Sequence, residues 1–325
     1  MSEARTPIIE ARGLKRSFKA RGAKGKTIDA VRGIDLTVYE GEIVGFLGPN
    51  GAGKTTTLKM LCTLIAPTDG TATVVGSDLR RDPLGVRRKI GYVSQAGSTS
   101  SEARAGEEIV SHAELYGIAP AEAKRRAQSL LSALDLDDIW TRSCGSLSGG
   151  QRRRLDIVMG LIHQPRLVFL DEPSTGLDPQ SRANLWTHIR QLRDEFGTTV
   201  FLTTHYMDEA DSLSDRLLVI DHGAIVAEGT PAELKKKVSG DTITLTLRST
   251  EDANTAAAIA ASLEGADTPV TETHVVRFHV PEGATALPVL LGRLTRDNID
   301  AIGVDVNRPT LDDVFLTLTG RSLRD

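Results

Sequence analysis

Short runs of alternating hydrophobic and polar positions occur along most of the chain, and segments with helical spacing separate them. We expect strands at residues 8–14, 30–39, 43–47, 71–75, 90–93, 167–170, 199–203, 217–220 and 225–227. The last two are expected to pair across a turn at 221–223. Helices are expected at 57–61, 148–161 and 181–196, and another begins at Thr230 with a capping box. This alternation of strands and helices favours the α/β class, with a mostly parallel sheet covered on both faces.

The pattern changes from residue 96. Residues 107–116 and 121–134 have helical spacing, and no strand pattern lies between them. We therefore expect an inserted helical subdomain at about 96–156, within a first domain that spans 1–238.

The strand pattern restarts after residue 239. Apolar residues alternate near 243–247, 276–280 and 302–306, and helical spacing lies between these runs. A last helix is expected to start at Thr310, with Asp313 in the capping position. The sequence thus predicts a second, small α+β domain at 239–325.

Composition limits the class of protein. The 325 residues are 40% hydrophobic, which suits one large and one small core. A net charge of −4 and a pI of about 6.0 give no cationic field, so we expect no nucleic-acid partner. Cys62 and Cys144 form neither a metal-spaced pair nor a disulfide framework. Without a long apolar run or a secretory signal, the chain itself is expected to be soluble and cytoplasmic.

A glycine-rich segment between the strand at 43–47 and the following helix fits the phosphate-loop pattern G-x-x-x-x-G-K-[ST]. Its residues are Gly48, Pro49, Asn50, Gly51, Ala52, Gly53, Lys54, Thr55 and Thr56. The glycines let successive N–H groups point at one anion. Lys54 would reach the β- and γ-phosphates of a nucleotide, and Thr55 would bind Mg²⁺. An ordinary glycine loop is the alternative, which the Gly-Lys-Thr triplet disfavours.

The apolar strand at 167–170 ends in two carboxylates. Asp171 would lie beside the metal, and Glu172 would lie over the γ-phosphate, where it could polarise a water molecule. A strand followed by a solvated acidic turn would be a credible alternative in isolation, but not beside a phosphate loop.

A second helix start suited to anions is expected at Leu147, Ser148, Gly149, Gly150 and Gln151. One nucleotide does not need two such sites from one chain. We therefore expect a two-fold homodimer in which this segment closes over the γ-phosphate held by the partner. The alternative is that Ser148 only caps the helix.

Taken in order over residues 8–234, these motifs resemble the ATP-binding subunit of an ABC transporter, a P-loop NTPase. In that family's terms, 48–56 is Walker A, 147–151 the signature and 167–171 Walker B. The resemblance adds Gln95 as the Q-loop residue that senses Mg²⁺ and the membrane partner. It adds 174–178 as the D-loop, with Asp178 at the nucleotide. The resemblance also makes His205 the switch residue that touches the γ-phosphate. Without the resemblance, a lone histidine after a strand would more often be structural.

Four features carry less specific information. Phe18 is the candidate for stacking on adenine, with a core position as the alternative. The basic loop at 19–26 is most simply a solvated face, although nucleotide phosphate or lipid headgroups are possible partners. Arg152, Arg153 and Arg154 are expected to form a solvated helical face. Residues 97–104 differ from the sequence that usually follows the Q-loop in this family. They therefore do not define the docking surface for the membrane partner.

The C-terminal segment 308–321 resembles the tail of daunorubicin-resistance-type exporter ATPases. This resemblance implies export of a drug or other hydrophobic compound through a separate integral-membrane permease. The chain would then lie peripherally on the cytoplasmic face of the cell membrane. The alternative is a soluble ABC-type ATPase acting on nucleic acid or ribosomes, and the acidic pI and single nucleotide domain oppose it. The presence of Lys54, Asp171, Glu172 and His205 disfavours a catalytically dead regulator.

Overall fold

The structure is a computed structural model that describes residues 5–19, 27–237 and 240–319. The chain divides after Thr230 into two compact units, and each unit is described by itself. The domain boundary expected at 238–239 and the basic loop beyond Lys19 lie outside the described residues.

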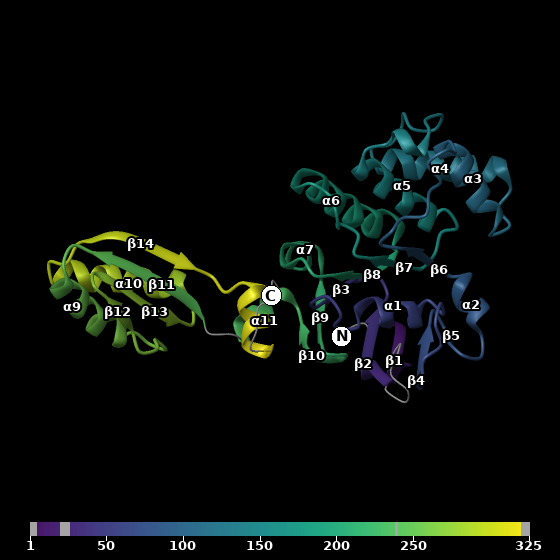
Figure 1. The fold of residues 1–325 in the computed structure, drawn as a ribbon. Coiled ribbons are helices and arrows are strands. Elements are labelled where there is room, and N and C mark those ends of the chain that lie inside the picture. Colours follow the sequence, from purple (N-terminus) through teal and green to yellow (C-terminus); the bar gives the residue numbers. More distant parts are fainter. Residues whose placement is uncertain (1–4, 20–26, 238–239, 320–325) are drawn as a thin grey trace. The chain divides into compact units, whose positions relative to one another are not determined.

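The main sheet of the first unit has six strands among the described residues, in the order β10-β9-β3-β8-β7-β6 (Figure 1). The strands are β3 (Ile43–Leu47), β6 (Ile90–Val93), β7 (Leu167–Asp171), β8 (Thr199–Thr204), β9 (Arg216–Asp221) and β10 (Ala224–Gly229). Every residue of β3, β7 and β8 is buried, which explains their continuous apolar sequences. All neighbours are parallel except the β9–β10 hairpin, so the expected parallel sheet and the expected pairing across the turn at 221–223 are confirmed.

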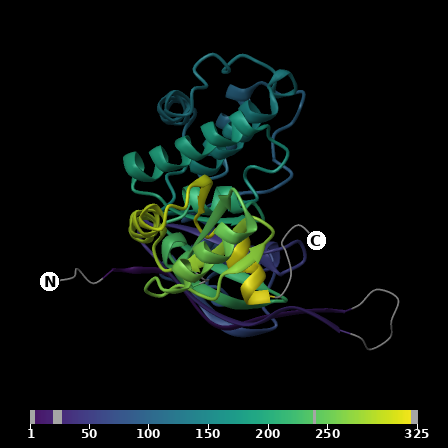
Figure 2. The ribbon, with the colours of Figure 1, turned by 90° about the vertical axis from the view of Figure 1, so that its left-hand side faces the viewer.

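A second sheet of the first unit is antiparallel and was not expected. Within the described ranges it has the order β2-β1-β4-β5. Its strands are β1 (Pro7–Lys19), β2 (Thr27–Tyr39), β4 (Asp69–Val74) and β5 (Ser77–Asp78). The first strand continues beyond the expected end at 14, because β2 pairs with it as far as Lys19 and Thr27. Figure 2 shows this β1–β2 ribbon, in purple, running on past the shorter β4.

Helices of the first unit either cover the main sheet or form a separate group. The helices beside the sheets are α1 (Lys54–Leu61), α2 (Pro83–Arg87), α6 (Pro179–Phe196) and α7 (Met207–Leu213). The separate group is α3 (Ala105–Glu114), α4 (Pro120–Ala133) and α5 (Gly149–Leu161), seen together in Figure 1. Its buried faces share a core that includes Ile109, Ala127 and Leu155. Helix α5 connects this group to the sheet through contacts with β6.

The second unit is built around an antiparallel sheet of the order β12-β13-β11-β14 in the described part of the chain. Its elements are α8 (Pro231–Lys237), β11 (Asp241–Leu247), α9 (Thr250–Ala261), β12 (Val270–Glu272), β13 (Val275–Val280), α10 (Gly283–Arg296), β14 (Ala301–Asn307) and α11 (Leu311–Thr319). Alternate residues of β11 and β13, such as Ile243 and Phe278, pack against α9 and α10. Helices segregated from an antiparallel sheet are typical of α+β units.

Candidate active site

The three central strands of the main sheet deliver the expected site residues to one edge. Strands β3, β8 and β7 are parallel neighbours, so their carboxyl ends lie together. The glycine loop follows β3, and His205 follows β8. Asp171 is the last residue of β7, and Glu172 comes directly after it. Ligands of open α/β sheets bind at such an edge, outside the carboxyl ends of the strands. The topology therefore brings residues that are far apart in the sequence to a common position.

Close backbone packing requires glycine at two positions of the loop. A Cβ on Gly48 would lie 2.2 Å from the carbonyl oxygen of Ile220, and one on Gly53 would lie 2.4 Å from that of Ala30. Gly53 also has a φ of 107° and stands at the N-terminus of α1, where among the described residues no side chain caps the helix. The first N–H groups of α1 are thus left for a ligand, and such a helix start favours phosphate.

The Lys54 ammonium group lies folded into this loop. Its Nζ donates to the carbonyl oxygens of Gly48, at 2.7 Å, and Pro49, at 3.1 Å, and lies 3.4 Å from Glu172 Oε1. The side chain is 4% exposed, and burial lowers the pKa of Lys54 although the Glu172 carboxylate opposes this shift. A buried ammonium group beside an uncapped helix start fits a polyphosphate, which would add negative charge to that of Glu172.

Two of the three expected metal ligands meet directly. Thr55 Oγ1 donates to Asp171 Oδ1 at 3.0 Å, and Thr203 Oγ1 donates to the same oxygen at 2.7 Å. Nowhere in the described ranges do three or more His, Cys, Asp and Glu side chains form a group that could hold a metal ion. One hydroxyl and one carboxylate fit Mg²⁺ bound together with nucleotide, since this ion commonly takes few protein ligands and uses phosphate oxygens and water.

The backbone of Glu172 has an unusual conformation. Its φ is 45°, in the left-handed region that non-glycine residues rarely adopt. Its N–H donates to both the carbonyl oxygen and the hydroxyl of Thr203, at 3.1 and 3.0 Å. Such conformations cluster at functional sites, where the surrounding structure holds them.

Four side chains surround the Glu172 carboxylate. Gln95 Nε2 donates to Oε2 at 3.0 Å, and Thr175 Oγ1 donates to the same oxygen at 3.2 Å. His205 Nδ1 also lies 3.2 Å from Oε2, at an angle poor for a hydrogen bond, and Lys54 approaches Oε1. The contact with His205, followed by the charge of Lys54, lowers the pKa of Glu172 to about 2 against the opposite effect of burial. The carboxylate is therefore ionised at neutral pH, as a general base must be.

The segment at 147–151 lies apart from the glycine loop. Ser148 caps α5 in a capping box: its Oγ accepts from Gln151 N at 3.2 Å, and Gln151 Oε1 accepts from Ser148 N at 3.1 Å. Within the described residues, no hydrogen bond or ion pair joins this segment to 48–56. Gly149 and Gly150 instead face Leu177 and Ser181.

Asp178, expected at the nucleotide, serves as the N-cap of α6. Its carboxylate accepts from Ser181 N at 3.0 Å and from Ser181 Oγ at 2.6 Å. These hydrogen bonds lower the pKa of Asp178. Asp178 is exposed, and Leu177 and Ser181 on either side of it lie against Gly149 and Gly150 at the start of α5.

Phe18 lies near the end of β1, opposite Ile28 of β2. Its side chain is 37% exposed, so the alternative that it is a core residue is wrong. The guanidinium carbon of Arg16 lies 4.6 Å from the ring centroid. An exposed ring held from one side by a cation can stack on a base, although nothing in the described contacts joins it to the glycine loop.

Arg153 is a site residue that the sequence did not reveal. The expected solvated helical face is wrong here, because Arg153 is 7% exposed and its guanidinium group contacts the residues around Glu172. Arg152 and Arg154 are partly buried and donate to the carbonyl oxygens of Cys144 and Leu134. The sequence offered no distinguishing signal, because Arg154 likewise stands four positions before an apolar residue, Val158.

A second unexpected group is the buried carboxylate of Glu209 on α7. It accepts hydrogen bonds from Ser174 Oγ and from Trp186 Nε1, the latter at 3.1 Å. Burial raises the pKa of Glu209. The group ties the segment 174–178 to the helix that follows His205, so two loops of the site share one buried anchor.

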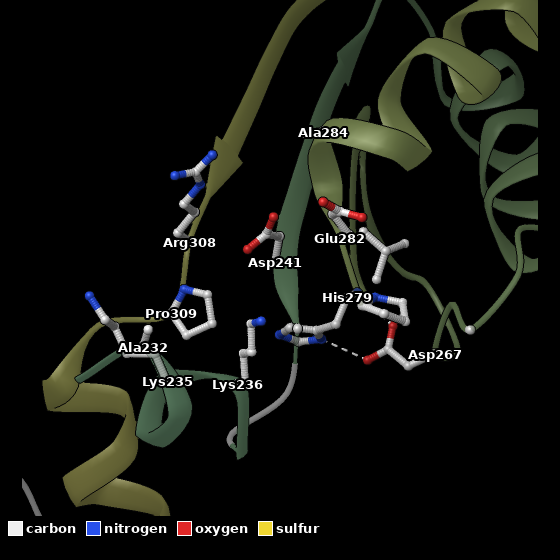
Figure 3. Close-up of a pocket in the computed structure, with 14 residues that line it drawn as sticks. Ala232, Lys235, Lys236, Asp241, Asp267, His279, Glu282, Ala284, Arg308 and Pro309 are labelled. Atoms are coloured by element: carbon white, nitrogen blue, oxygen red, sulfur yellow. Dashed lines mark hydrogen bonds and ion pairs between the residues drawn. The ribbon is translucent and has the colours of Figure 1, made fainter. Parts of the chain in front are cut away.

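A cavity of the second unit differs in character (Figure 3). Lys236 and Arg308 line it together with the acidic Asp241 and Glu282, and His279 Nδ1 lies 2.7 Å from Asp267 Oδ2. Charges of both signs balance here, and Asp241 already accepts from Gly283 N. The phosphate-binding features thus belong to the first unit.

No helix of the described residues is long and apolar enough to cross a membrane.

Comparison with known proteins agrees with this geometry. The family model described as ABC transporter matches residues 31–175, and a model of the C-terminal domain of DrrA1-3-like ATP-binding proteins matches 229–319. The chain is 39% identical to the daunorubicin/doxorubicin resistance ATP-binding protein DrrA of Streptomyces peucetius, over all of this chain and 96% of that one. It is 41% identical to the daunorubicin resistance ATP-binding protein DrrA3 of Streptomyces coeruleorubidus, over 91% and 92% of the two chains.

Among solved structures, the chain is similar to a dimeric ATP-binding cassette in a post-hydrolysis state, bound to ADP and Pi. The TM-score is 0.61 at 25% sequence identity, and the match covers 69% of this chain and 98% of that chain.

Proposed function

The chain belongs to the ABC transporter family, and on this premise we propose that it is the ATP-hydrolysing subunit that powers export of a drug or other hydrophobic compound. The compound would pass through a separate integral-membrane permease, and the chain would bind peripherally at the cytoplasmic face of the cell membrane. The observation that carries the proposal is the convergence of Lys54, Glu172 and His205 at one sheet edge. The resistance proteins among its relatives support the class of transported compound.

Binding of the nucleotide is assigned to the glycine loop and its neighbours. The N–H groups at the start of α1 and the Lys54 ammonium group would hold the phosphates, and Thr55 and Asp171 would hold Mg²⁺. When bound, Mg²⁺ would neutralise negative charge on the phosphates. Gln95 is the third residue assigned to the metal, which requires its amide to leave Glu172.

Hydrolysis is assigned to Glu172 and its partners. The ionised carboxylate accepts a proton from the attacking water molecule, and Thr175, which donates to its Oε2, orients it. His205, 25% exposed beside Glu172, would donate to the γ-phosphate. Lys54 would exchange its contact with Glu172 for the phosphates, which would free the base for water.

We propose that the working form is a homodimer with two shared sites. Ser148, Gly149, Gly150 and Gln151 of one chain would close over the γ-phosphate held by its partner, and Asp178 would lie at the same junction. Among the described residues no hydrogen bond joins this segment to the glycine loop, and Gly149 and Gly150 face Leu177 and Ser181, which supports this arrangement. Phe18 would stack on adenine.

Purification from native membranes tests the exporter assignment. We expect the tagged full-length chain to bring down a membrane-spanning protein in a fixed ratio, together with Mg²⁺-dependent ATPase activity that is lost in Lys54→Ala. Mass spectrometry of the purified complex and phosphate release are the measurements. Recovery with ribosomes or nucleic acid, and without a membrane protein, would favour the soluble ABC-type ATPase and contradict export.

The second domain is proposed to serve assembly with the permease, because the phosphate-binding features lie in the first unit. A chain ending at Ser239 is expected to bind ATP with unchanged affinity and to lose the membrane partner. Fluorescent-nucleotide titration and co-purification measure the two properties, with the full chain as control. Full assembly and export by the shortened chain would assign the domain another role.

A further inference from the structure

The guanidinium group of Arg153 lies among three backbone carbonyls close to the base. Its Nε donates to Pro173 O and its Nη2 to Asp171 O, both at 2.9 Å, and its Nη1 donates to Ser94 O at 2.5 Å. Arginine carries its donors in a rigid planar fork, so one side chain can hold several acceptors in fixed directions. Lysine cannot reproduce this set.

Two of these carbonyls flank Glu172. Asp171 and Pro173 are its neighbours in the chain, and Glu172 itself has the left-handed φ of 45°. A backbone in this region persists only where its surroundings hold it on both sides. Arg153 Nη2 and Thr203 together hold the peptide group between Asp171 and Glu172, through Asp171 O and Glu172 N, and Arg153 Nε holds the peptide group that follows Pro173.

The third carbonyl belongs to the residue before Gln95. Gln95 Nε2 donates to Glu172 Oε2 at 3.0 Å, so its position determines one of the bonds that orient the carboxylate. Arg153 therefore fixes the backbone of the base and the backbone of a residue that contacts the base. Both are fixed relative to α5, whose first residues are Gly149 and Gly150.

The charge of this buried group is compensated nearby. Burial lowers the pKa of Arg153, and the carboxylates of Asp156, Asp171 and Glu209 counter that shift. Asp156 in turn accepts from Ser98 N and Oγ, just beyond Gln95. The segment that contains Gln95 is thus attached to α5 at two points.

We propose that Arg153 is a positioning residue for hydrolysis. It sets the place of Glu172 and Gln95 and couples both to α5, so that a shift at the start of α5 is transmitted to the base. The inference rests on the proposed ATPase function. It adds a connection within one chain between the segment 147–151 and the base.

Substitutions at 153 and 154 in the full-length chain test this role. Arg154 is the matched control, because it is the next residue of α5 and donates to Leu134 O among the separate helices. We expect Arg153→Lys and Arg153→Gln to lower kcat at least 10-fold, with KM and ATP affinity within two-fold of the parent chain. Arg154→Lys and Arg154→Gln should keep kcat within two-fold. Equal KM with lower kcat indicates a loss that affects the reaction and not binding.

Hydrogen exchange of backbone amides gives a second readout that does not depend on activity. In Arg153→Lys, which keeps the charge, exchange should accelerate at 94–98 and 172–175 and stay unchanged in α6 and β3. Arg154→Lys should leave all these segments unchanged. Uniform acceleration across the first unit would reveal a general loss of stability and overturn the proposal.

The outcomes separate the two levels of inference. A parent chain without ATPase activity would contradict the proposed function, and the exchange experiment would still decide whether Arg153 holds these segments. If the parent chain is active and Arg153→Lys and Arg153→Gln leave kcat unchanged, the positioning role is wrong and the proposed function stands. An equal loss of kcat in the Arg154 variants would also overturn the positioning role.

Discussion

Replacement of Glu172 by glutamine is expected to lower ATP turnover by roughly 10²-fold or more while ATP binding stays intact. Glutamine keeps the size of the side chain and can still accept from Gln95 and Thr175, but it cannot take a proton from water. Lys54 remains to hold the phosphates, and it loses a charged partner in the variant. The measurements are steady-state phosphate release and nucleotide titration.

Lys54→Ala is the comparison variant for Glu172→Gln. Lys54→Ala should weaken nucleotide binding itself, because it removes the ammonium group from the glycine loop. Near-normal hydrolysis by Glu172→Gln would refute the role of Glu172. A loss of ATP affinity as large as that in Lys54→Ala would show that Glu172 acts in binding.

The low pKa of Glu172 gives a further expectation for the same residue. Because the folded-state pKa is about 2, below the ordinary 4.5, the ionised form is favoured in the folded chain. Its contribution to stability is fully present above pH 4.5 and is lost as the pH falls toward 2. Likewise, kcat/KM should show no loss above pH 5 from protonation of this group. A pH profile of the parent chain measures this, and an acid limb near pH 6 that disappears in Glu172→Asp would contradict it.

The parts of the fold that could be predicted are those specified by neighbouring residues. The continuous apolar run at 43–47 and the glycines after it define a strand and a turn locally, and β3 and the loop follow them. The run at 167–170 likewise gives β7, with Asp171 at its end. Parallel pairing then places these ends together, so the combination of Lys54, Thr55 and Asp171 was predictable.

What could not be predicted depends on contacts between distant segments. The extension of β1 to Lys19 requires its pairing with β2, which no local pattern encodes. The burial of Arg153 requires carbonyls from two loops to meet at one point, and a run of three arginines is in general a solvated face. The caps formed by Ser148 and Asp178 are local to α5 and α6, whereas the closeness of Gly150 to Ser181 depends on how these two helices pack.

Substitution of Ser148 by arginine is expected to abolish both hydrolysis and ATP-driven dimerisation while leaving ATP binding by the single chain nearly unchanged. The prediction follows from two helix starts suited to phosphate, at Gly53 and at Ser148, between which the described part of the chain shows no hydrogen bond. The first can bind ATP alone. The second gains an anion only when a partner presents one, and a bulky cation at 148 would fill that space.

The capping role of Ser148 requires a matched control. Ser148→Arg also removes the acceptor for Gln151 N, and loss of an N-cap costs about 1 kcal/mol of helix stability. Ser148→Ala removes the same acceptor without adding bulk or charge. It should therefore share any loss of stability with Ser148→Arg and retain part of both hydrolysis and dimerisation.

The decisive measurement is sedimentation with ATP in the Glu172→Gln background, where a closed dimer should persist long enough to be observed. We expect dimers for the background chain and for Ser148→Ala, and monomers for Ser148→Arg and Lys54→Ala. Only Lys54→Ala should also fail in nucleotide titration. If Ser148→Arg lost ATP affinity as severely as Lys54→Ala, the two helix starts would have to share one site within the chain. The composite dimer would then be wrong, because a contact made by the partner cannot contribute to binding by a monomer.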